Sequence, residues 1–187
     1  MPEVSEKDIK ELIKKSKKGD KEAFGEIYEL FAERIFRYIY LKVGNKEEAE
    51  DLTQQVFIRT WESLKNFQFR KNPFSSWVYR IAHNLVVDFY RKQKETLSLN
   101  DEIRVEIVDS LDLDENLYYK EEFKKILKLI NQLPEEQKDI LMLRFIDDLS
   151  YGEIAKIMKK SPLTLRVLQH RALKKLKELM NNNEQQK

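Results

Sequence analysis

The side chains best suited to chemistry lie near the end of the chain, in a segment whose charge is entirely positive. Residues 156–177 hold eight lysines and arginines and no aspartate or glutamate. Four polar side chains in this segment recur three or four positions apart: Arg166, His170, Lys174 and Lys177. That spacing gathers them on one face of a helix, where cations bind phosphates, so the segment predicts contact with DNA.

The elements that must position this face are two short helices joined by a tight turn. Ser150 and Glu153 fit a capping box, and Ser161 followed by Pro162 is a second helix start. The second helix has an apolar stripe that we expect to be buried: Leu165, Leu168, Ala172, Leu176 and Leu179. The pattern is typical of a helix-turn-helix, whose second helix enters the DNA major groove. An ordinary helical hairpin with a solvated basic face is the alternative.

A second candidate surface lies in residues 74–92, which read FSSWVYRIAHNLVVDFYRK. Most of the aromatic residues fit an apolar stripe, with one side expected to hold Trp77, Ile81, Leu85 and Phe89. The polar side holds arginine and asparagine, which can stack on unpaired bases and pair with base edges. The residues alone leave single-strand contact and plain packing equally open.

The sequence gives no positive case for an enzyme or a metal site. His83 and His170 are far apart and lack metal-ligand spacing. We find no glycine-rich phosphate loop and no nucleophile motif, so we expect no catalytic residue, no cofactor and no small-molecule substrate.

Residues 48–57 have a polar, acidic side next to an apolar stripe. From this pattern alone, the polar side is best interpreted as a solvated helix face.

Composition restricts the fold to helices. Glycine and proline number only four each, 36% of the 187 residues are charged, and apolar residues recur at helical spacing almost throughout. The lack of cysteine excludes disulfides and thiolate metal sites, and no apolar run approaches the roughly 20 residues of a membrane span. We therefore expect an all-α protein of the cytoplasm.

Charge and periodicity divide the chain into two small helical domains. We expect a helical bundle over residues 1–94, an acidic flexible linker over 95–115, a second bundle over 116–180 and a disordered tail over 181–187. Residues 101–115 hold seven acidic residues against one arginine, so the linker should not bind nucleic acid.

Local signals place the helix boundaries of the first domain. A first helix should run from Ile9 and end at Gly19, and Asp20 should cap the second helix. Gly44 should break the second helix. The apolar stripes of the second and third helices are expected in the core, and they include Tyr28 and Trp61.

Several segments together resemble the extracytoplasmic-function (ECF) group of bacterial RNA polymerase sigma factors. Residues 49–61, AEDLTQQVFIRTW, resemble the polymerase-binding helix of sigma domain 2, and residues 74–92 its promoter-melting and minus-10 segment. Residues 133–158 resemble the start of sigma domain 4, and residues 164–178 its recognition helix. The resemblance covers about residues 9 to 180, in order and across the acidic linker.

The resemblance implies partners. Asp51, Gln54 and Gln55 would face the clamp coiled coil of the polymerase largest subunit, and the second domain would meet the flap of the second subunit. Promoter DNA and an anti-sigma factor are further expected partners, and the anti-sigma factor could hold the protein at the membrane.

The resemblance also implies DNA contacts, listed here by segment. Phe67 and Asn84 would hold a flipped minus-10 base, with Trp77, Arg80 and Arg91 near the melted strand. The minus-35 duplex would be met by Ser161, Thr164, Arg166 and Arg171, beside His170 and Lys174 of the basic face.

The sequence departs from the family pattern mainly in the turn and the recognition helix. Lys160 and Leu163 stand where glycine is usual, and Gln55 stands where an acidic residue is common. Val167 and Leu168 replace the usual serine and arginine, which would remove phosphate contacts or change base reading. Val167 could instead contact a thymine methyl group.

We therefore expect a sigma factor that binds polymerase core and directs initiation at specific promoters. Two alternatives remain open at this point. The chain could be a stand-alone helix-turn-helix regulator, although no dimerisation element is visible. It could also be a sigma-like adaptor that has lost minus-35 reading, for which the apolar Val167 and Leu168 are the motive.

Overall fold

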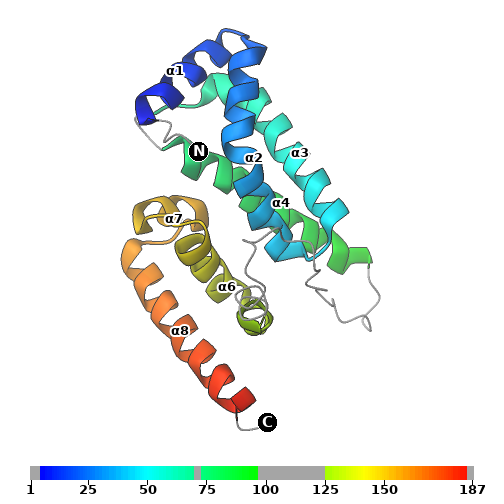
Figure 1. The fold of residues 1–187 in the computed structure, drawn as a ribbon, viewed down its shortest axis with the longest axis vertical. Coiled ribbons are helices and arrows are strands. Elements are labelled where there is room, and N and C mark those ends of the chain that lie inside the picture. The colour runs from blue at the N-terminus through cyan, green and yellow to red at the C-terminus, as the bar shows by residue number, and fades with distance from the viewer. Residues whose placement is uncertain (1–4, 70–72, 97–124, 185–187) are drawn as a thin grey trace, which may run out of the picture. The chain divides into compact units, whose positions relative to one another are not determined.

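The fold consists of helices in two compact units, Met1–Asp101 and Glu102–Lys187 (Figure 1). The computed structural model describes residues 5–69, 73–96 and 125–184, and every regular element within these ranges is helical. The expected all-α class is therefore confirmed. The acidic linker was expected over 95–115, but α4 continues through Thr96, so its first two residues are helical. The rest of the expected linker, and residues 116–124 of a helix expected over 116–131, lie outside the described residues.

The first unit is built around one long helix. Its elements are α1 (Glu6–Lys17), α2 (Lys21–Val43), α3 (Lys46–Ser63), the 3₁₀ turn η1 (Leu64–Asn66) and α4 (Phe74–Thr96). Helix α2 packs against each of α1, α3 and α4. The fully buried centre of the unit holds Ile13, Ile27, Ile35, Tyr38, Val56 and Tyr79.

Local side-chain caps fix the boundaries of these helices. The Ser5–Asp8 capping box starts α1 at Glu6, three residues before the apolar pattern begins. The Asp20 carboxylate accepts a hydrogen bond from the Ala23 N–H at 3.0 Å, so its predicted capping role is confirmed. Gly44 ends α2 with φ 74°, a left-handed conformation that favours glycine.

The buried stripe of α4 differs from the expected one. Its buried residues are Phe74, Ser76, Val78, Tyr79, Ala82, Leu85 and Val86. Trp77, Ile81 and Phe89, which were expected in the core, are only half-buried. The stripe is rotated because α4 packs against both α2 and α3, so the residues that face the groove between these two helices become buried.

The second unit packs its last helix on two shorter ones. A helical segment over residues 125–130 precedes α6 (Glu135–Leu141), the π-helical turn η2 (Met142–Ile146), α7 (Tyr151–Met158) and α8 (Pro162–Glu184). Helix α8 contacts both α6 and α7. It continues to Glu184, so the prediction of a disordered tail from residue 181 is wrong for its first four residues.

Candidate nucleic-acid interface

Two caps build the predicted helix-turn-helix. The Ser150 hydroxyl accepts a hydrogen bond from the Glu153 N–H at 3.3 Å, and the Glu153 carboxylate accepts one from the Ser150 N–H at 3.0 Å. In the turn, Lys159 ends α7 with φ 55°. The Ser161 hydroxyl then accepts a hydrogen bond from the Thr164 N–H at 3.1 Å and starts α8. Both predicted caps are confirmed.

An ion pair ties the turn to the rest of the second unit. The Lys160 ammonium lies 2.9 Å from the Glu136 carboxylate on α6. Lys160 stands where the family pattern usually has glycine. The residue of the turn with the left-handed backbone conformation that favours glycine is Lys159, not Lys160. The departure at Lys160 is therefore compatible with the fold.

Helix α8 separates a buried side from a basic side. Leu165 and Ala172 are fully buried, and Leu168, Leu176 and Leu179 are half-buried. The residues expected on the DNA-facing side are all exposed: Ser161, Thr164, Arg166, His170, Arg171 and Lys174. Leu168 lies at the edge of the buried side, so its apolar character fits packing in the second unit.

Tyr151 joins the two helices of the motif. Its hydroxyl donates a hydrogen bond to the Gln169 side-chain oxygen at 2.7 Å. The Arg166 guanidinium lies 5.3 Å from the centre of its ring, and the Arg144 guanidinium lies at 5.7 Å. Arg144 also donates to Asp148 and to the Leu149 carbonyl, each at 3.2 Å. Sequence reasoning missed Tyr151, which had no role in the motif beyond its position in the capping box.

Helix α4 gathers four of the predicted DNA-binding residues on one side. Trp77, Arg80, Asn84 and Arg91 recur three, four and seven positions apart, so they lie within about 60° of each other around the helix. Asn84 and Arg91 are exposed, and Arg91 forms an ion pair with Asp88 at 3.1 Å. This side lies away from the buried stripe, as contact with DNA requires.

Phe67, unlike Asn84 and Arg91, is buried. Its side chain is 3% exposed, and its ring contacts the rings of Phe69, Phe74 and Trp77 at centroid distances of 5.0, 5.4 and 4.8 Å. The Lys17 ammonium donates a hydrogen bond to the Phe67 carbonyl. In this structure Phe67 supports the half-buried Trp77, and a direct contact of Phe67 with a base remains a prediction.

The three residues expected to face the polymerase lie on the outer side of α3. Asp51, Gln54 and Gln55 are all exposed, and the neighbouring Ile58 is 56% exposed. Partial burial raises the pKa of Glu48 at the start of the same helix. The outer side of α3 is thus polar over residues 51–55, and Ile58 adds one exposed aliphatic side chain beside it.

An apolar cleft between α2 and α3 borders this outer side. It is lined by Lys21, Phe24, Tyr28, Gln54, Phe57, Ile58, Trp61 and Glu62. The Phe24 and Trp61 rings meet edge to face at 4.8 Å, and those of Tyr28 and Phe57 at 4.6 Å. Tyr28 and Trp61 were expected in the core, but Tyr28 is exposed and Trp61 is half-buried. Both helices present aromatic rings here because no other helix among the described residues of the first unit lines the cleft.

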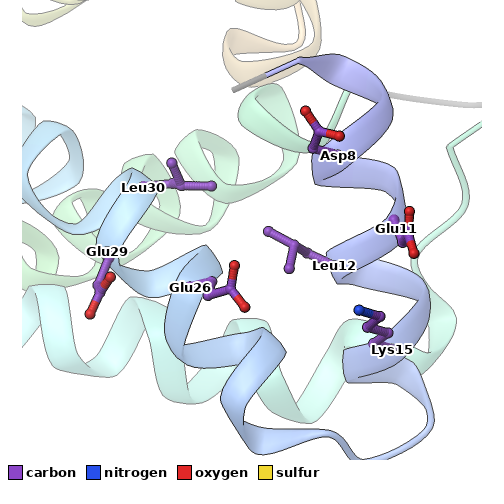
Figure 2. Close-up of a pocket in the computed structure, with 7 residues that line it drawn as sticks. All are labelled: Asp8, Glu11, Leu12, Lys15, Glu26, Glu29 and Leu30. Carbon is purple, nitrogen blue, oxygen red and sulfur yellow. The ribbon is translucent and has the colours of Figure 1, made fainter. Parts of the chain in front are cut away.

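A second cleft, between α1 and α2, is acidic (Figure 2). Leu12 points from α1 toward α2, where Glu26 lies opposite it, and Asp8, Glu11 and Glu29 add further carboxylates. A hydrogen bond from the Ser5 hydroxyl lowers the pKa of Asp8. Lys15 also lines the cleft, but four carboxylates outnumber its one ammonium group, so we expect the cleft to repel phosphate and place it outside the candidate DNA interface.

The part of the chain that the structure describes has neither a metal-binding cluster nor a membrane-spanning helix. No group of three or more histidine, aspartate or glutamate side chains there could hold a metal ion. No helix among these residues is long and apolar enough to span a membrane.

Comparison with known families gives matches in both units. The profile of Sigma-70 region 2 matches residues 27–96, and the profile of Sigma-70 region 4 matches residues 123–176. The first profile covers α3 and α4, and the second covers α7 and most of α8. A region 2 match does not support the alternative of a stand-alone helix-turn-helix regulator.

Relatives of known class align over nearly the whole chain. The ECF RNA polymerase sigma factor SigW of Bacillus subtilis is 33% identical over 183 residues, which cover 93% of this chain and 97% of that protein. The ECF sigma factor BldN of Streptomyces coelicolor is 30% identical over 179 residues, which cover 91% of this chain and 65% of that protein.

Solved structures share the fold. The structure of CnrH in complex with the cytosolic domain of CnrY has a TM-score of 0.70 at 19% identity and covers 91% of this chain and 96% of that one. The sigma factor RpoE of Bartonella quintana, solved with the anti-sigma factor NepR, has a TM-score of 0.66 at 20% identity, with coverages of 84% and 96%. The chain belongs to the ECF family of RNA polymerase sigma factors, which bind the polymerase and direct initiation at specific promoters.

Proposed function

We propose that the first unit of this sigma factor binds the polymerase core through the outer side of α3. The observation that carries this proposal is the exposure of Asp51, Gln54 and Gln55 together, beside an apolar cleft that Gln54 also lines. A polar rim around exposed aromatic and aliphatic residues is the usual anatomy of a protein interface. The clamp coiled coil of the largest subunit is the partner that the family resemblance implies.

The polar side of α4 would then hold the melted minus-10 strand. Asn84 and Arg91 are exposed there, and Trp77 is supported by Phe67 at 4.8 Å between ring centroids. Extruding a base costs a few kcal/mol, which stacking and hydrogen bonds to the base must offset. A half-buried tryptophan with an exposed asparagine two turns away supplies both kinds of contact.

The second unit would read the minus-35 duplex with α8. Its basic face is exposed from Arg166 to Lys174, and its N-terminus is capped by Ser161. Backbone N–H groups at a capped helix start and flanking arginines suit phosphate contacts, which fix the register of the helix on DNA. The flap of the second polymerase subunit would meet this unit as well.

No bond chemistry is needed for this role. The protein would act in the cytoplasm by binding melted promoter DNA more tightly than closed duplex, which shifts the population toward the open complex. We propose that it is not an enzyme and that it needs no cofactor.

We also propose that an anti-sigma factor regulates the protein. The structures that share its fold, CnrH and RpoE, were solved with CnrY and with the anti-sigma factor NepR. CnrY is present there as a cytosolic domain, which is consistent with a regulator that holds a sigma factor at the membrane.

The α3 proposal can be tested by measuring affinity for purified polymerase core. Replacing Asp51, Gln54 and Gln55 by alanine should weaken core binding at least tenfold, because three contacts are lost without changing the buried side of α3. A matched control replaces three exposed glutamates of α2 by alanine: Glu26, Glu29 and Glu33. Equal loss of binding in both triple variants, or in neither, would contradict the assignment of α3.

A further inference from the structure

Two large apolar side chains stand on the exposed side of α8. Leu163 is 70% exposed and Val167 is 45% exposed. They are four positions apart, so they lie about 40° apart around the helix and follow each other by one turn. Because Leu165 and Ala172 are the residues of α8 that are fully buried, Leu163 and Val167 are not part of the core. We call Leu163 and Val167 the apolar ridge.

The surroundings of the apolar ridge are cationic. Arg166, His170 and Arg171 are exposed on its two sides, and residues 156–177 contain no acidic residue. A surface of this charge attracts a polyanion. The ridge lies in the first two turns of α8, the part of a recognition helix that meets base edges in the major groove.

A base edge that suits an aliphatic side chain in the major groove is the C5-methyl group of thymine. We propose that Leu163 and Val167 read thymine methyl groups in the minus-35 duplex and so determine promoter choice. The inference rests on the proposed docking of α8 on that duplex. The apolar ridge would then determine sequence specificity at positions 163 and 167, where the family pattern leads one to expect glycine and serine.

The test uses the full chain assembled with polymerase core. Duplexes are selected from a pool with a randomised minus-35 region, and each thymine of the selected sequence is then replaced in turn by deoxyuridine, which removes only the methyl group. Loss of one buried methyl contact, about 0.8 kcal/mol, corresponds to about a fourfold loss of affinity. We expect such a loss at one or more thymines.

Alanine variants identify the reader of each thymine. Leu163→Ala or Val167→Ala should bind the thymine and deoxyuridine duplexes equally at the position that its own side chain contacts. Leu173→Ala is the matched control, because Leu173 is 41% exposed on the same helix but lies about 120° around the helix from Val167. This variant should keep the fourfold discrimination. Thermal unfolding of each variant confirms that the second unit is folded.

Two different failures can be told apart. If Arg166→Ala and Arg171→Ala weaken binding of the selected duplex, but no thymine is sensitive to deoxyuridine, the inference about the ridge is wrong while α8 docking stands. If both ridge variants still bind the thymine duplex more tightly than the deoxyuridine duplex, the inference about the ridge is likewise wrong while α8 docking stands. If no minus-35 sequence is enriched, or the two arginine variants bind as the wild type does, then α8 docking and the inference fall together.

Discussion

At the scale of single residues, Tyr151 shows how a residue outside the interface can control one inside it. Its ring lies 5.3 Å from the Arg166 guanidinium, and its hydroxyl holds Gln169 on the same helix. Arg166 is exposed and has a long, flexible side chain, so contact with an aromatic ring limits the positions that its guanidinium visits. Tyr151 is thus a positioning residue for a proposed DNA contact.

Tyr151→Leu should weaken binding of the minus-35 duplex about two- to fivefold, since a cation–π contact at an exposed site contributes about 0.5–1 kcal/mol. Tyr151→Phe keeps the ring and should retain most of the affinity. Equilibrium binding in a double-mutant cycle with Arg166→Ala measures the coupling. If Tyr151→Leu has the same effect in the presence and absence of Arg166, Tyr151 does not act through Arg166.

At the scale of helices, short-range signals were predictable and tertiary packing was not. Asp20, Ser150 and Ser161 were identified as caps because each bonds to a backbone N–H three residues away, so the sequence contains both partners. The burial of Phe67 and the exposure of Tyr28 depend on which helices pack against them. Local periodicity contains no such information.

The features of the candidate site also divide into those that the sequence predicts and those that depend on tertiary packing. The exposure of Asp51, Asn84 and Arg166 was predictable, because each lies opposite an apolar stripe or follows a family motif. The apolar cleft between α2 and α3 was not, because its lining residues looked like core residues in the sequence. The same holds for the contact between Tyr151 and Arg166, which joins two helices.

A comparison of two glycines in the first unit can isolate the effect of backbone conformation on stability. Gly19 has φ 96°, whereas Gly25 lies inside α2, and a Cβ atom at either position would meet nothing within 4 Å. Gly19→Ala should therefore destabilise the unit by about 1–2 kcal/mol through backbone strain alone. Gly25→Ala should stabilise it by up to about 1 kcal/mol.

Urea unfolding followed by tryptophan fluorescence measures both effects, because the two tryptophans, Trp61 and Trp77, lie in the first unit. Opposite signs for the two substitutions are the expected result. If Gly19→Ala left the midpoint unchanged or raised it, the turn between α1 and α2 would not require a left-handed residue.

At the scale of the whole molecule, the chain separates its tasks by charge and by unit. The outer side of α3 is polar with an apolar cleft beside it, the cleft between α1 and α2 is acidic, and α8 is basic. A net charge of only +2 conceals this separation. Two of these surfaces therefore suit the partners proposed for them: the polymerase core for the outer side of α3, and DNA for α8.

Run-off transcription tests whether this sigma factor contacts a promoter at two points, the minus-10 and minus-35 elements, while it is bound to polymerase. Purified chain and polymerase core are given a pool of genomic promoter fragments. We expect discrete transcripts that require the chain, and a large loss of these transcripts in Asn84→Ala at unchanged core binding. The control Asn182→Ala, an exposed asparagine at the far end of α8, should transcribe normally.

Two outcomes would contradict this expectation. If folded chain that binds the polymerase core yields no specific transcript, or if Asn84→Ala loses core binding and transcription to the same extent, the two-point account of promoter recognition is wrong.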